Sequence, residues 1–260
     1  MAKIAIVSDI HGNWHALQAV MAEIQTLCPD RIVCLGDTVG YGADPAKCIE
    51  HLRGLGATMI MGNHDLMVLH LRIKGIDHLP NDWSRSGELA GYVHSMRELS
   101  DEQIEWLKES LLVDAEEQCL LAHANLHQPL SFEHMQNNKQ ARPTLDMLKL
   151  QKIPVGFFGH THVQEVFCHK PSKLAWVDDR SFLASSVHHA AVMVGSVGMS
   201  READDLRAAW AVYDSTTGVV ELRKTEYDRI GAAVAILHAG LPLETALNLL
   251  TKEEYHQLLS

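Results

Sequence analysis

The chain lacks any apolar run of eighteen or more residues, which is roughly the length that a helix needs to cross a bilayer. Its N-terminus lacks the small-residue cleavage pattern of a signal peptide, and the apolar run after Lys3 is too short for one. No C-x-x-C pair occurs among the five scattered cysteines, which argues against a disulfide framework or a zinc ribbon. From these absences we expect a cytoplasmic protein with reduced thiols and no membrane span.

Dense runs of lysine and arginine are also absent, and the formal net charge is −11 at pH 7. A protein that coats nucleic acid carries a basic surface, because its affinity depends on contacts to phosphates. The composition therefore argues against long nucleic acid as a partner. It does not argue against a small anionic substrate held through metal ions, because carboxylates that bind cations count here as bare charges.

The expected elements begin as strand–helix–strand–helix–strand and continue mostly as strands. Apolar runs predict strands at residues 3–7, 31–35, 58–61, 118–122, 155–158, 163–167, 174–177, 190–194, 208–213 and 219–225. Helices are expected from Asn13 to about residue 28, from Asp44 to Gly54, over most of 66–112, and over 229–239 and 243–259. This order predicts one α/β domain, residues 1–260, with a second sheet in its later half.

Polar side chains follow five of the early strands at the point where each strand ends. The stretches are SDIH, LGD, MGNHD, AHAN and GHTH. Loops at the carboxyl ends of the strands in an open α/β sheet face one common edge, so we expect these side chains to converge there. The candidate metal ligands are Asp9, His11, Asp37, Asn63, His123, His160 and His162.

Carboxylates, imidazoles and an amide oxygen suit Mn²⁺, Fe or Zn²⁺, and the absence of cysteine among them disfavours a structural zinc site. Seven ligands exceed what one tetrahedral ion needs, and one carboxylate can bridge two ions. Two ions about 3.5–4 Å apart would activate a hydroxide and hold the oxygens of a phosphoester in line. Taken singly, Asp9 or Asn63 is better explained as a turn or cap residue, and it is the five clusters in this order that indicate a metal site.

The chain resembles the calcineurin-like metallophosphoesterase superfamily over nearly its whole length. The blocks that carry the resemblance are Asp9–His11, Gly36-Asp37, Gly62–Asp65, His123 and Gly159–His162. The stretches GDTVGYGADP (36–45), LSDEQIEWLKESL (99–111) and GSVGMSRE (195–202) resemble a small prokaryotic, phosphodiesterase-like branch. The resemblance implies a four-layer αββα sandwich, in which two mixed β-sheets are flanked by helices, with a dinuclear metal centre.

The resemblance also implies a ligand set for each of two ions. The first ion would take Asp9, His11, Asp37 and His162, and the second would take Asp37 as a bridge with Asn63, His123 and His160. His64 matches the family's non-ligand histidine, which steadies the phosphoryl group or protonates the leaving oxygen. Tyr41 and Arg201 are candidate substrate contacts because they lie in loops expected at the metal edge, and Asn13 is another, although it can also cap its helix.

Two departures from the family's usual pattern bear on function. His123 lies in AHAN, whereas the corresponding histidine usually follows a glycine. TVGYG follows Asp37, without the Asp-Arg-Gly of the protein serine/threonine phosphatases. That difference removes the arginine those enzymes use on the phosphate and argues against a dedicated protein phosphatase.

The sequence thus predicts a metal-dependent hydrolase of phosphomonoesters or phosphodiesters that uses two divalent ions, with Mn²⁺ favoured over Fe, Zn²⁺ or Ni²⁺. The expected partner is a small phosphorylated or nucleotide-like substrate. Alternatives on the same site are a nucleotide or dinucleoside polyphosphate hydrolase, or a nuclease. The alternative outside enzymes is a metal-binding scaffold, which the intact ligand set and His64 argue against. The oligomeric state is left open.

Overall fold

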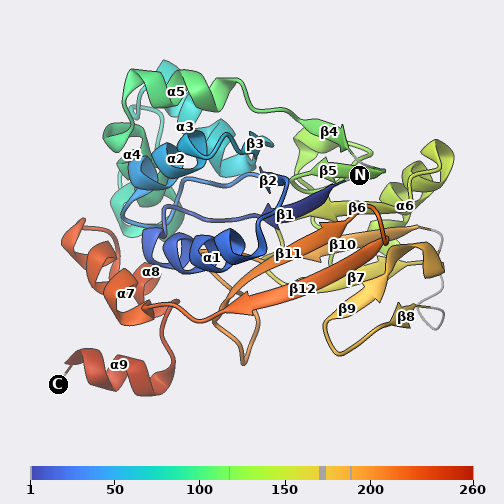
Figure 1. The fold of residues 1–260 in the computed structure, drawn as a ribbon. Helices are drawn as coiled ribbons and strands as arrows, with labels where there is room; N and C mark the ends of the chain where they lie inside the picture. Colours follow the sequence, from blue (N-terminus) through green and yellow to red (C-terminus); the bar gives the residue numbers. More distant parts are fainter. Residues whose placement is uncertain (1, 117, 170–173, 188, 260) are drawn as a thin grey trace.

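Residues 2–116, 118–169, 174–187 and 189–259 are described by a computed structural model of the chain (Figure 1). The larger of its two sheets contains β1 (Lys3–Val7), β2 (Arg31–Cys34), β3 (Thr58–Met59), β8 (Ala175–Trp176), β9 (Ser181–Leu183), β11 (Ala208–Asp214) and β12 (Val219–Thr225). Their order across the sheet is β3-β2-β1-β11-β12-β9-β8. The first three strands are parallel and the other neighbours pair antiparallel, so the sheet is mixed.

The smaller sheet contains β4 (Val113–Glu116), β5 (Cys119–Ala122), β6 (Val155–Phe158), β7 (Gln164–Cys168) and β10 (Ala190–Val194). Their order is β4-β5-β6-β10-β7. The three central strands are parallel, and both edge strands pair antiparallel with them.

Helices cover the outer faces of both sheets (Figure 1). Their bounds are α1 Trp14–Leu27, α2 Pro45–Gly54, α3 Asn63–Lys74, α4 Gly87–Glu98, α5 Asp101–Lys108, α6 Asn138–Gln151, α7 Arg229–His238, α8 Leu243–Leu247 and α9 Lys252–Leu259. Apolar residues of α1 and α2 pack on the larger sheet, and those of α6 pack on the smaller one. The four-layer αββα sandwich with two mixed sheets is therefore confirmed.

Strand β1 shows how one short run serves two layers of the sandwich. Ile4 and Ile6 join the cluster between the two sheets, which also contains Phe157 of β6. Ala5 and Val7 belong instead to the cluster beneath α1. Successive side chains of a strand point to opposite faces, so a strand buried on both faces is apolar at every position.

The structure differs from the sequence prediction at several elements. Strands β4 and β9 lie outside the predicted apolar runs. Helix α6 was not predicted, because Pro143 interrupts its apolar stripe and proline is rare inside helices. The closing helix predicted over 243–259 is two helices, α8 and α9. Residue Thr251 and residue Glu254 bond each other's backbone N–H in a capping box, which starts α9 afresh. The third strand ends at Met59 and continues only as an isolated bridge between Ile60 and Leu111.

Gln164, at the start of β7, joins the two sheets close to the GHTH turn. Its side-chain Nε2 donates to the carbonyl oxygen of Val194 at 3.2 Å in the smaller sheet. It also donates to the carbonyl oxygens of Trp210 at 2.9 Å and Arg223 at 3.1 Å, which lie opposite each other in the larger sheet. One amide therefore fixes the smaller sheet's edge strand against the larger sheet, two residues after His162.

We expect Gln164→Met to lower the free energy of unfolding by about 1–3 kcal/mol, because a thioether of similar length cannot donate hydrogen bonds to those carbonyl oxygens. Urea denaturation followed by circular dichroism measures the change. The control is Gln18→Met on the exposed face of α1, which should stay within about 0.5 kcal/mol of the parent protein. Equal stability of the two variants would contradict a clamp between the sheets.

Candidate metal centre

The seven predicted ligands come together beyond the carboxyl ends of the strands. They lie in the loops after β1, β2, β5 and β6 and at the start of α3. Three groups have ligand atoms within 4.8 Å of one another, namely Asp9, His11 and His162; His11, Asp37 and His64; and Asp37, His123 and His160. Asn63 reaches the third group, with its Oδ1 3.1 Å from Nε2 of His123. Asp37 belongs to two groups and therefore lies between them.

The backbone at five of these residues is left-handed. Asp9, His11, Asp37, His160 and His162 have φ values of +52°, +51°, +52°, +67° and +63°. They are five of the nine described non-glycine residues with positive φ. Such a conformation costs on the order of 1 kcal/mol or more for a residue with a Cβ, and it persists only where the surroundings hold it. The strain is concentrated at one place, which indicates a functional site.

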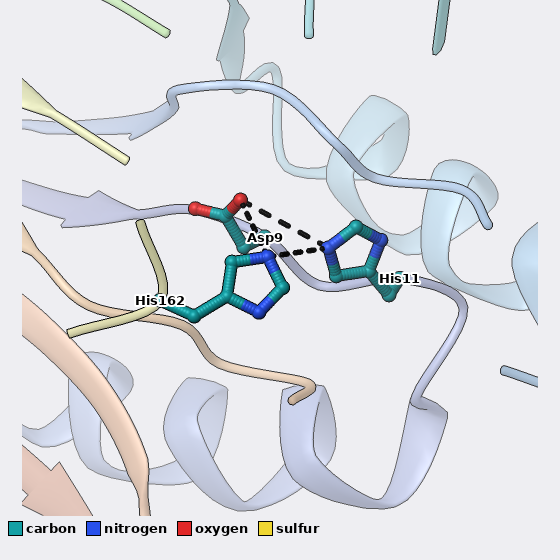
Figure 2. A group of neighbouring side chains, drawn as sticks. All are labelled: Asp9, His11 and His162. Carbon is teal, nitrogen blue, oxygen red and sulfur yellow. Dashed lines mark hydrogen bonds and ion pairs between the residues drawn. The ribbon is translucent and has the colours of Figure 1, made fainter. Parts of the chain in front are cut away.

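Figure 2 shows the first group, in which Asp9, His11 and His162 turn toward one point. Nδ1 of His11 lies 3.1 Å from the carbonyl oxygen of Val39, and Nδ1 of His162 lies 2.6 Å from that of Met199. A carbonyl oxygen can only accept, so each neutral ring carries its proton on Nδ1. The two Nε2 lone pairs then face each other at 3.0 Å. Lone pairs at that distance repel, and a shared cation removes the repulsion.

His123 repeats this arrangement in the third group. Its Nδ1 lies 2.8 Å from the carbonyl oxygen of Leu35, so its Nε2 faces the site. That Nε2 lies 3.4 Å from Oδ2 of Asp37 and 3.2 Å from Nδ1 of His160. His160 is held by its own backbone N–H, which donates to the Asp9 carboxylate at 2.9 Å. Oxygen and nitrogen lone pairs thus gather at a second point.

The electrostatics of the buried groups point the same way. Burial alone would raise the pKa of Asp37, yet the charges of His123 and His64 hold that pKa well below its usual range. Burial would lower the pKa of His123, but the charges of Asp37 and Asp9 overcome it and raise the pKa to about 9. Burial and the neighbouring His123 lower the pKa of His160 to about 3. The two carboxylates therefore favour a positive charge at this point, which a proton on His123 or a bound cation can supply.

This donor set fits two divalent cations. The carboxylates and imidazoles of the first group, with Asp37, can hold one ion, and Asp37, Asn63, His123 and His160 can hold a second. The carbonyl oxygens on each Nδ1 fix the tautomer and the ring orientation, as the outer contacts of metal-binding histidines do.

His64, the third member of the group with His11 and Asp37, lies at the start of α3. Its Nε2 is 3.9 Å from Oδ2 of Asp37, and its ring packs edge-on against His11 and Tyr92 with centroids 4.5 and 4.7 Å away. Burial lowers its pKa from the ordinary value, against the opposing charge of Asp37. A Cβ at Gly40 would lie 2.5 Å from Nδ1 of His64, so only glycine lets the loop approach this ring.

The three predicted substrate contacts have different surroundings. Asn13 is 5% exposed, and both ends of its amide are engaged: Oδ1 accepts from the N–H of Ala16 at 3.1 Å, and Nδ2 donates to the carbonyl oxygen of Gly198 at 2.9 Å. It caps α1. Tyr41 packs against His11 and His64 with both centroids 4.9 Å away, and its phenol interacts with the side chain of Arg201. Tyr41 and Arg201 therefore border the candidate centre.

Sequence reasoning missed Asp65, the last residue of GNHD. Its fully buried carboxylate accepts from the backbone N–H groups of Asp37 at 2.8 Å, Gly62 at 3.1 Å, Thr38 at 3.0 Å and Val39 at 3.4 Å. Burial and the charge of Asp37 raise its pKa to about 7. Asp65 thus joins the loop after β2 to the start of α3. Its spacing of three from the helix cap was the available signal.

His134 was also missed. It lies in the loop between β5 and α6, and its ring packs on that of His160 with centroids 4.1 Å apart and an interplanar angle of 32°. The loop has no periodic pattern, so its place beside the centre depends on the fold and could not be read from spacing.

Comparisons with known proteins agree with this geometry. The sequence model of the calcineurin-like phosphoesterases matches residues 2–164, so the chain belongs to that family. It is similar to a metallophosphoesterase structure from Sphaerobacter thermophilus, with a TM-score of 0.81, 27% identity, and coverage of 96% of this chain and 98% of that one.

Two curated relatives differ in what they cover. An uncharacterised protein of Methanocaldococcus jannaschii is 28% identical over 249 residues, which is 92% of this chain and 93% of that protein. A symmetrical bis(5′-nucleosyl)-tetraphosphatase of Erwinia tasmaniensis is 30% identical over 131 residues, which is 46% of this chain and 43% of that enzyme. Across the described residues, no helix is both long and apolar enough to span a bilayer.

We expect Asp65→Asn to lower the free energy of unfolding by about 1.5–3 kcal/mol, because the amide cannot accept from all four N–H groups as the carboxylate does. The Asp37 loop should loosen with it, so the variant should also hold less metal after reloading. Chemical denaturation and elemental analysis measure the two effects. Asp77→Asn, at an exposed carboxylate, is the control and should change neither. Full metal content in Asp65→Asn would show that the loop keeps its shape without this carboxylate.

Proposed function

We propose that this chain is a phosphoester hydrolase that uses two divalent metal ions. The observation that carries the proposal is that the three histidines His11, His123 and His162 each bond a backbone carbonyl through Nδ1 and turn Nε2 toward two buried carboxylates. Asp9, His11, Asp37 and His162 would hold one ion, and Asp37, Asn63, His123 and His160 the other. Bound there, such ions supply positive charge for phosphoryl oxygens and lower the pKa of water.

The protein's own groups would place the substrate and move its protons. His64 lies within reach of a phosphoryl group at the centre, and a bound anion would favour the protonated ring against the effect of burial. It can then donate a hydrogen bond to that group or a proton to the leaving oxygen. Arg201 can pair with a non-reacting phosphoryl oxygen while Tyr41 orients its guanidinium. The capping bonds of Asn13 make it the weakest of the three proposed substrate contacts.

A phosphodiester or phosphomonoester is the substrate class that the site supports. A dinucleoside polyphosphate is a second candidate, favoured by the partial match to the bis(5′-nucleosyl)-tetraphosphatase of Erwinia tasmaniensis. Mn²⁺ as the metal, one domain over 1–260 and a cytoplasmic location stay predictions from the sequence.

The proposal is tested by stripping the protein of metal, reloading it with Mn²⁺ and comparing hydrolysis of bis-p-nitrophenyl phosphate and p-nitrophenyl phosphate. We expect turnover that requires the metal and is faster for the diester. If two ions bind per chain and neither ester, nor a dinucleoside polyphosphate, is hydrolysed, the proposed substrates are wrong, and a narrower natural substrate or a metal-binding scaffold replaces them.

We further expect His64→Ala to keep its metal content and to lose turnover by about 10²–10⁴-fold, which is the usual contribution of a positioned proton donor. Elemental analysis and steady-state kinetics separate the two readouts. His70→Ala, at an exposed histidine of the same helix, is the matched control and should retain both. Loss of metal in parallel with activity would mean that His64 supports the metal centre itself.

A further inference from the structure

A hollow lies beside the candidate metal centre. It has a volume of about 450 Å³, and its polar lining consists of His127, Glu133, His134, Gln136, Lys139 and Gln140. His134 is shared with the metal centre, because the same ring packs on His160 at 4.1 Å. The ring of His134 thus separates the metal centre from the hollow. A molecule whose reacting group lies at the centre can extend past this ring into the hollow.

The hollow gathers hydrogen-bond donors in a chain that is acidic overall. Lys139 is exposed at the start of α6 and, within the part of the chain that the structure describes, forms no ion pair. His127 also lines the hollow; its Nδ1 is buried, so Nε2 is the ring nitrogen that a ligand can reach. Helix α6 directs the positive end of its dipole here, although its cap Asn137 already accepts from the N–H groups of Lys139 and Gln140.

One group opposes an anion in this hollow. The Glu133 carboxylate lies 3.8 Å from Nε2 of His127 and is 66% exposed. Its exposure lets water screen it and lets the side chain turn outward, whereas Lys139 and the two imidazoles remain in the lining. Cationic and N–H donors are what phosphate oxygens accept from most strongly.

We propose that this hollow is a subsite for the phosphate groups that neighbour the one being hydrolysed, which favours a substrate with a chain of phosphates among the candidates for this site. This proposal deepens the proposed function. Hydrolysis of such a substrate depends on the proposed metal centre, whereas binding of a phosphate chain in the hollow does not. Lys139 and His127 contact the distal phosphates, and His134 lies between them and the reacting group.

The binding is tested on metal-free protein by calorimetric titration with tripolyphosphate and with orthophosphate at one ionic strength. We expect tripolyphosphate to bind more tightly. Lys139→Gln should weaken tripolyphosphate binding about tenfold while changing orthophosphate binding less. Glu133→Gln removes the opposing charge and should strengthen tripolyphosphate binding several-fold. Lys149→Gln, at an exposed lysine in the last turn of the same helix, is the control and should leave both affinities unchanged.

Opposite shifts in the Lys139 and Glu133 variants support the subsite, because a general loss of fold cannot strengthen binding. Equal affinities in both variants and the parent protein, or no preference for tripolyphosphate over orthophosphate, would overturn it. A kinetic readout is available with Mn²⁺-loaded protein, where Lys139→Gln should raise KM for a dinucleoside tetraphosphate more than it lowers kcat. If the parent protein hydrolyses no phosphoester, the proposed function fails, while the calorimetry still decides whether the hollow binds polyphosphate.

Discussion

The candidate site depends on a backbone that is held in left-handed conformations at the ends of its strands. The loops that carry Asp9, His11 and Asp37 hold one another, since the N–H of Asp9 donates to the carbonyl oxygen of Gly36 at 3.0 Å and that of His11 to Asp37 at 2.9 Å. The N–H of Gly198 donates in turn to the carbonyl oxygen of Asp9 at 2.9 Å. These bonds between loops stabilise conformations that an isolated chain would avoid, and the site exists only when the two sheets are assembled.

The same assembly sets the charge balance at the centre. Two carboxylates that are 1% exposed or less would be costly to bury alone, and only partial compensation comes from a proton on His123. Cations that bind the folded chain and not the unfolded one would stabilise the fold by mass action. Metal binding at this centre would therefore be coupled to folding, and the formal charge of −11 would overstate the charge of the protein with such ions bound.

The strands and the candidate metal ligands were predictable from the sequence because short, local patterns of residues indicate them. Apolar runs indicated most of the strands, and the polar clusters that end five of them indicated where the candidate ligands meet. Helix α6 was not predicted because Pro143 is unfavourable inside a helix, and packing of the helix on the smaller sheet outweighs that cost. His134 and the hollow beside it depend on where an irregular loop comes to lie. Asp65 accepts from main-chain N–H groups, which nearly every residue has, so the sequence does not show which of them its carboxylate will reach.

The carbonyl oxygens that fix His11, His123 and His162 belong to the main chain of Val39, Leu35 and Met199. Replacing any of these three side chains leaves its carbonyl in place, so point substitution cannot delete the acceptor. A substitution at Val39, Leu35 or Met199 therefore does not by itself remove the hydrogen bond that orients the imidazole. Sensitivity to substitution lies with the groups that hold the main chain in place, such as the buried carboxylate of Asp65 and the core side chains of Leu35 and Val39.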